Sequence, residues 1–65
     1  MNRVRYYREK KMMSQEQLES ASGVSRQTIS DLENNKKDNV LAKTMVAIAD
    51  ALGESVQDIF FCKDS

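Results

Sequence analysis

Residues 14–34 read SQEQLESASGVSRQTISDLEN and predict two short helices separated by a tight turn. Ser14, followed by Gln17 three positions later, has the pattern of a capping box at the start of a helix. Gly23 ends that helix, because glycine adopts the left-handed backbone conformation at little steric cost. The apolar residues expected on the inner face of this helix are Leu18 and Ala21.

The second helix is predicted from Arg26 to about Asn34, with Ser25 as its N-cap. Ile29 and Leu32 have the spacing of an inner face, which leaves the polar residues on the outer side. Two helices joined by so short a turn cross at a steep angle, so the second helix can project into the major groove of DNA. The alternative is an ordinary exposed helix whose polar side chains are only solvated.

The rest of the chain extends this pattern to five short helices around one core, an all-α fold. We expect a first helix at 2–11 and a last one at 55–61. Polar residues 34–39 form a connection in which Asn35 is expected to take the left-handed conformation. A longer helix follows the connection and ends at Gly53. Its apolar residues are Leu41, Ala42, Met45, Val46, Ile48, Ala49 and Leu52.

The composition excludes several kinds of function. The 65 residues suffice for one small domain, 1–65. The chain has no His and one Cys, so it lacks an imidazole base and cannot build a His or thiolate metal site. It also lacks a glycine-rich phosphate loop, and we expect no enzyme activity, no metal and no cofactor. No apolar run reaches the about 20 residues of a membrane span, and a single Cys suits a reducing compartment. We therefore expect a cytoplasmic protein that binds neither membranes nor small molecules.

Charge is distributed unevenly, although ten basic and ten acidic residues give a net charge of zero. Residues 1–13 carry five basic side chains and one acidic one, whereas 14–38 and 39–65 are each net negative. A basic surface that attracts nucleic acid is compatible with this distribution, and so is a solvated helix surface without a ligand.

Three segments carry a family likeness: Ser14-Gln15-Glu16-Gln17-Leu18, Gly23-Val24-Ser25-Arg26-Gln27-Thr28-Ile29-Ser30 and Leu32-Glu33-Asn34. They closely resemble the helix-turn-helix of phage repressor and Cro proteins, the XRE family. The likeness extends over about residues 3–61, with Ile48-Ala49-Asp50-Ala51-Leu52-Gly53 and Asp58-Ile59-Phe60. It implies a five-helix, lambda-repressor-like DNA-binding domain. It further implies that Arg8 and Glu33 form a buried ion pair between the first and third helices, and that Gln15 contacts phosphate.

We expect the residues that contact DNA to lie at the start and on the outer side of the second helix of the motif. Arg26 can bind guanine bidentately and Gln27 can pair with adenine. Asp31 either accepts a hydrogen bond from cytosine or repels phosphate. Glu19 stands where such motifs usually have a small Ala, so either the helix crossing differs slightly or the side chain turns outward. The predicted DNA-binding residues are Gln15, Ser25, Arg26, Gln27, Thr28, Ser30, Asp31, Asn34, Lys36 and Lys37.

The helices within 41–61 are expected to complete the core and to contribute a homodimer contact, beside the helix-turn-helix at 15–34. The last helix is more apolar than one small core requires, and an exposed apolar cluster is typical of an isologous interface. The predicted interface residues are Val56, Ile59, Phe60 and Phe61. The alternative is that both Phe side chains complete the core of the monomer.

The sequence thus predicts a transcriptional regulator that binds a palindromic operator in double-stranded DNA as a dimer and represses transcription. Two alternatives are left open. One is an antitoxin or a restriction-modification controller of the same fold. The other is a protein-interaction module that sequesters a related regulator through its helices, which the neutral net charge and Asp31 motivate.

Overall fold

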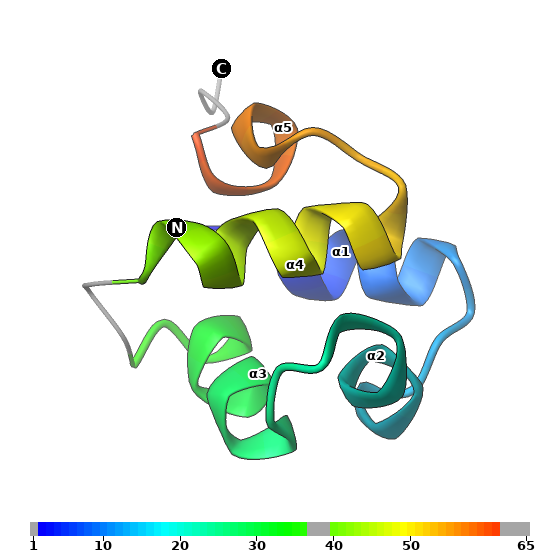
Figure 1. Ribbon diagram of the computed structural model, residues 1–65. Coiled ribbons are helices and arrows are strands. Elements are labelled where there is room, and N and C mark those ends of the chain that lie inside the picture. The colour runs from blue at the N-terminus through cyan, green and yellow to red at the C-terminus, as the bar shows by residue number, and fades with distance from the viewer. Residues whose placement is uncertain (1, 37–39, 62–65) are drawn as a thin grey trace.

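A computed structural model describes residues 2–36 and 40–61 of the chain (Figure 1). These residues form five α-helices and no β-strand. The helices are α1 (Val4–Lys10), α2 (Gln15–Ser22), α3 (Arg26–Glu33), α4 (Ala42–Leu52) and α5 (Val56–Phe60). The predicted all-α, five-helix fold is therefore confirmed. No helix in the described part of the chain is long and apolar enough to span a lipid bilayer.

The two ends of α2 follow the predicted chemistry. The Ser14 hydroxyl accepts a hydrogen bond from the backbone N–H of Gln17 at 3.0 Å, and the Gln17 side-chain oxygen accepts one from the backbone N–H of Ser14 at 2.8 Å. Gly23 ends the helix with φ 76°. No atom lies within 4 Å of the place where a Cβ on Gly23 would stand. The backbone conformation, and not a lack of space, therefore favours glycine here.

Two residues other than glycine also adopt the left-handed conformation. Asn35 has φ 56°, as expected from its place in the polar connection. Met12 has φ 58°, and nothing in its side chain indicates this conformation. The end of α1 imposes it, because the backbone N–H groups of Met12 and Met13 turn back to the carbonyl oxygens of Glu9 and Arg8, at 2.9 and 3.0 Å.

The core lies where α4 passes between α5 and the pair formed by α2 and α3 (Figure 1). The helix α1 packs against α3, α4 and α5, so it closes the remaining side of the core. Each helix contributes at least one residue that solvent barely reaches, and together the five supply a single apolar cluster. The buried residues are Val4, Leu18, Ile29, Leu32, Ile48, Ala49, Leu52 and Ile59.

Several apolar residues of the predicted helix patterns lie outside this core: Ala21, Leu41, Ala42 and Val46 are exposed, and Met45 is half-buried. Ala21 is exposed, because the inner side of α2 runs through Leu18 and Ser22; the half-buried Ser22 hydroxyl donates to the Leu18 carbonyl at 2.7 Å. Leu41 is 64% exposed. It is the N-cap of α4 and has an extended backbone, so its side chain does not continue the inner face of that helix.

Candidate nucleic-acid interface

The helix α3 presents its polar residues to solvent and its apolar residues to the core. Ile29 and Leu32 are buried, and they fix which side of α3 faces inward. Arg26 and Gln27 are exposed in the first turn. The remaining predicted contact residues on α3 are half-buried, and they are Thr28, Ser30 and Asp31. The structure therefore places these side chains together along the uncovered side of one helix.

The start of α3 is held by hydrogen bonds from two directions. The Ser25 hydroxyl accepts from the backbone N–H of Thr28 at 3.2 Å and donates to the Thr28 hydroxyl at 2.9 Å. From the preceding helix, the Glu19 carboxylate accepts from the backbone N–H of Arg26 at 3.1 Å. Glu19 is half-buried, and its carboxylate turns toward the start of α3. Reading the sequence missed this contact, since it joins residues on two different helices.

The polar side chains of α3 also bond to one another along the helix. The Gln27 amide nitrogen donates to the Asp31 carboxylate at 3.0 Å. The Asn34 amide nitrogen donates to the Ser30 carbonyl at 2.9 Å and lies 3.4 Å from the Ser30 hydroxyl. These bonds restrict the rotamers of Gln27 and Asn34 before any ligand arrives. By contrast, the Arg26 side chain is not tied by a hydrogen bond or an ion pair to any residue that the structure describes.

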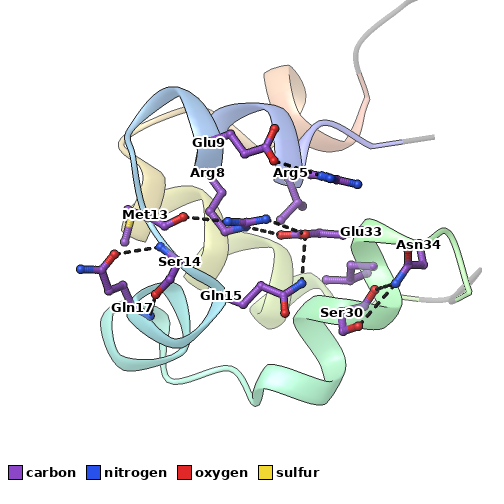
Figure 2. Close-up of polar contacts among 12 residues, drawn as sticks. Arg5, Arg8, Glu9, Met13, Ser14, Gln15, Gln17, Ser30, Glu33 and Asn34 are labelled. Atoms are coloured by element: carbon purple, nitrogen blue, oxygen red, sulfur yellow. Dashed lines mark hydrogen bonds and ion pairs between the residues drawn. The ribbon is translucent and has the colours of Figure 1, made fainter.

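A buried polar network supports α3 from beneath, and Figure 2 shows it between α1, α2 and α3. Arg8 Nε and Nη2 donate to the two carboxylate oxygens of Glu33 at 2.6 and 3.1 Å, and Arg8 Nη1 donates to the Met13 carbonyl at 2.7 Å. The side chains of Arg8 and Glu33 are only 12% and 4% exposed. The hydrogen bond with Glu33 raises the pKa of the Arg8 guanidinium above its ordinary value, although burial acts in the opposite direction.

Gln15 belongs to the same network, because its amide nitrogen donates to the Glu33 carboxylate at 3.1 Å (Figure 2). This bond holds the half-buried Gln15 side chain at the first residue of α2. The Gln15 amide oxygen has no partner among the described residues. This oxygen, the second amide proton and the backbone N–H of Gln15 are therefore available to a ligand. Lys36 is exposed and lies three residues after Glu33, the last residue of α3. Lys37, which the sequence also predicts as a DNA contact, lies outside the described residues.

Each basic residue of the N-terminal segment 1–13 contacts another side chain of the protein. Arg8 is buried against Glu33, Arg5 pairs with Glu9 at 3.2 Å, and Lys11 Nζ lies 3.8 Å from the carboxylate of Glu54. Arg3 and Lys10 both lie over the ring of Tyr6, at 5.9 and 5.8 Å from its centroid. Arg5, Lys10 and Lys11 remain exposed, so part of the net charge of +4 over 1–13 lies at the surface.

The residues predicted for a dimer contact separate into three groups. Ile59 has no exposed surface, so it belongs to the core of this chain and cannot contact a second chain in this conformation. Val56 and Phe60 are half-buried and pack against the core. Phe61 is 61% exposed, and on α4 the apolar Val46 is 49% exposed. Of the four predicted interface residues, Phe61 is the one that presents a large apolar surface to solvent.

Comparison with known proteins agrees with this geometry. The sequence profile of the helix-turn-helix family matches residues 4–59. The chain is also 41% identical over 63 residues to an uncharacterized HTH-type transcriptional regulator of Methanocaldococcus jannaschii, and the match covers 97% of this chain and 94% of that protein. The match includes all five helices and the turn at Gly23. The chain therefore belongs to the helix-turn-helix family of phage repressor and Cro-like proteins.

Proposed function

We propose that this protein is a sequence-specific DNA-binding transcriptional regulator. The observation that carries the proposal is the uncovered polar side of α3, with Arg26 and Gln27 in its capped first turn and two buried apolar residues beneath. The helix-turn-helix family and the HTH-type regulator of Methanocaldococcus jannaschii support DNA binding and transcriptional regulation. The roles of single residues, the dimer and repression are our inferences from the chemistry of the site.

Base recognition is assigned to the first turn of α3. The Arg26 guanidinium suits the O6 and N7 atoms of guanine, and the Gln27 amide suits the N6 and N7 atoms of adenine. The Gln27 amide nitrogen donates to Asp31 at 3.0 Å. The Gln27 amide oxygen is left to accept a hydrogen bond from adenine N6. Asp31 has a second oxygen left for a cytosine amino group. Ser30 and Thr28, which are both half-buried, suit a thymine methyl group or a phosphate.

Phosphate contacts are assigned to the residues around α3 that position it in the groove. Gln15 lies at the first residue of α2, where backbone N–H groups lack partners within the helix and attract anions. Ser25, Asn34, Lys36 and Lys37 flank α3 in the chain. Such contacts fix the register of the protein on DNA without reading sequence.

A homodimer completes the proposal, because one recognition helix contacts too few base pairs to define an operator. Two copies related by a twofold axis place their recognition helices about one turn of DNA apart, ~34 Å between centres. We assign the contact to Phe61, the exposed edge of Val56 and Phe60, and Val46 on α4. A dimer bound over a promoter blocks transcription by occupying the site, so the proposed regulation is repression.

Selection of bound duplexes from a random pool tests this proposal. We expect the protein to enrich a palindromic sequence whose half-sites are separated by about one helical turn. Failure to enrich any sequence would contradict DNA recognition, and enrichment of unpaired half-sites would contradict the dimer. Transcription in vitro from a promoter that overlaps the enriched site should fall as the protein is added; a rise would contradict repression.

A further inference from the structure

Glu19 brings a negative charge from α2 to the first turn of the recognition helix α3. Its carboxylate accepts a hydrogen bond from the backbone N–H of Arg26 at 3.1 Å, across seven positions of the chain. Glu19 forms no ion pair with any residue in the described ranges 2–36 and 40–61. Its charge is therefore not neutralised by a neighbouring cation, although the side chain is half-buried.

The carboxylate changes what the start of α3 offers to an approaching anion. The first three backbone N–H groups of a helix lack partners within it and, with the helix dipole, attract anions. In α3 the N–H of Thr28 is taken by the Ser25 hydroxyl, and that of Arg26 by Glu19. Of these three groups, only the N–H of Gln27 has no partner among the residues that the structure describes. A phosphate oxygen near this end meets a carboxylate in place of the Arg26 donor, and a hydroxyl in place of the Thr28 donor.

This arrangement affects the two modes of DNA binding differently. Binding to arbitrary sequences depends almost wholly on phosphate attraction, so a carboxylate beside the groove weakens it. Binding to the operator depends also on the exact placement of the Arg26 and Gln27 side chains. The hydrogen bond from Glu19 holds the backbone that carries them. Glu19 thus weakens binding to arbitrary sequences and favours binding to the operator.

We propose that Glu19 is a specificity-determining residue, whose carboxylate at the start of α3 suppresses binding to arbitrary DNA while it orients the base-reading turn. This inference rests on the proposed DNA-binding function.

The test compares Glu19→Gln with the wild type in equilibrium binding to two labelled duplexes. One duplex carries the sequence that the wild type enriches from a random pool, and the other has the same bases in scrambled order. Gln keeps an oxygen that accepts from the Arg26 N–H but removes the charge. We expect Glu19→Gln to bind the scrambled duplex about two- to fivefold more tightly at low salt, corresponding to one charge at a helix terminus. The gain should vanish at high salt, where such interactions are screened.

For the enriched duplex we expect a smaller change, because the lost repulsion is offset by a weaker, uncharged hydrogen bond. The ratio of the two affinities therefore falls. Asp50→Asn is the matched control, since it removes the same charge from the exposed side of α4, where Asp50 has no side-chain partner among the described residues. Asp50→Asn should leave the ratio unchanged.

Three results would overturn the proposal. An equal gain on both duplexes would show general repulsion without an effect on specificity. The same fall in ratio for Asp50→Asn would show an effect of net charge and not of position. No change in either affinity would show that the carboxylate does not influence DNA. If the wild type enriches no sequence, the proposed function itself fails, and that result is obtained before any variant is made.

Discussion

The buried pair of Arg8 and Glu33 allows a quantitative prediction, because an exposed pair on the same helix serves as its control. Replacing Glu33 by Gln removes a carboxylate that accepts two hydrogen bonds from Arg8 and one from Gln15. The Glu33 side chain is 4% exposed and that of Arg8 is 12% exposed, so water cannot readily replace the lost charge. The Arg8 guanidinium, whose pKa is raised mainly by the hydrogen bond with Glu33, then remains charged without its hydrogen-bonded countercharge.

The expected cost follows from that burial. Breaking a buried ion pair by removing one partner costs about 3–5 kcal/mol, and we expect the lower end because Gln keeps one acceptor oxygen. A loss of about 3 kcal/mol lowers the melting temperature of a domain this small by roughly 12–24 °C. It is a large share of the total, since a chain of this length has a free energy of unfolding of about 3–10 kcal/mol.

Thermal unfolding followed by circular dichroism measures the effect, and Glu9→Gln is the control. Glu9 pairs with Arg5 at a similar distance, 3.2 Å, but their side chains are 56% and 65% exposed. Exposed pairs of this kind contribute about 0.3–0.5 kcal/mol, so Glu9→Gln should shift the melting temperature by a few degrees. Equal shifts for Glu9→Gln and Glu33→Gln would refute the role given to burial.

A double variant separates the cost of the unpaired charge from the value of the pair itself. Replacing Arg8 by Met and Glu33 by Leu removes both charges and fills similar volume with apolar atoms. Such replacements are often neutral or stabilising, because neither charge then has to be desolvated. We expect the double variant to unfold within about 1 kcal/mol of the wild type. A double variant as unstable as Glu33→Gln would show that geometry, and not the uncompensated charge, sets the cost.

Three further variants test the site and the interface. Arg26→Ala should cost about 1–3 kcal/mol of operator affinity and relax selection at one base pair. Equal weakening on all sequences would instead place Arg26 on phosphate. Lys10→Ala, which removes a positive charge from α1, is the control in the same binding assay. Gly23→Ala should lower the free energy of unfolding by roughly 1–2 kcal/mol in urea titrations, because φ 76° disfavours a Cβ even where space is open, and an unchanged midpoint would contradict this. Phe61→Ser should shift sedimentation toward the monomer with little effect on melting, because 61% of Phe61 is already exposed; a dimer that persists would move the interface elsewhere.

The helix ends show which features of the fold can be predicted from neighbouring residues alone. Ser14 and Ser25 were recognisable as N-caps because each hydroxyl bonds a backbone N–H only three residues ahead, and the structure has both bonds. Gly23 was recognisable as a helix end for a similarly local reason. Met12 was not, because its left-handed conformation results from where the chain must go after α1 and not from its own side chain.

Which side chains are buried was harder to predict from the sequence than where the helices lie. Periodicity identified the inner sides correctly at Leu18, Ile29 and Ile48, yet it also favoured Ala21 and Leu41, which solvent reaches. Ile59 was assigned to a dimer contact and is instead wholly buried in its own chain. An apolar side chain has the same character in a core and at an interface, so only the arrangement of the other helices decides between them.

What the order of residues determined by itself is therefore the set of helices, their caps and the polar outer side of α3, since each depends on atoms within about one helical turn. The tertiary structure alone decided which charges are neutralised and which act on a ligand. It buried Arg8 against Glu33, spread the other cations of the N-terminal segment over internal partners, and brought Glu19 to the first turn of the recognition helix. Electrostatic interactions depend on distance and burial in space, and neither is written in the spacing of residues along a chain.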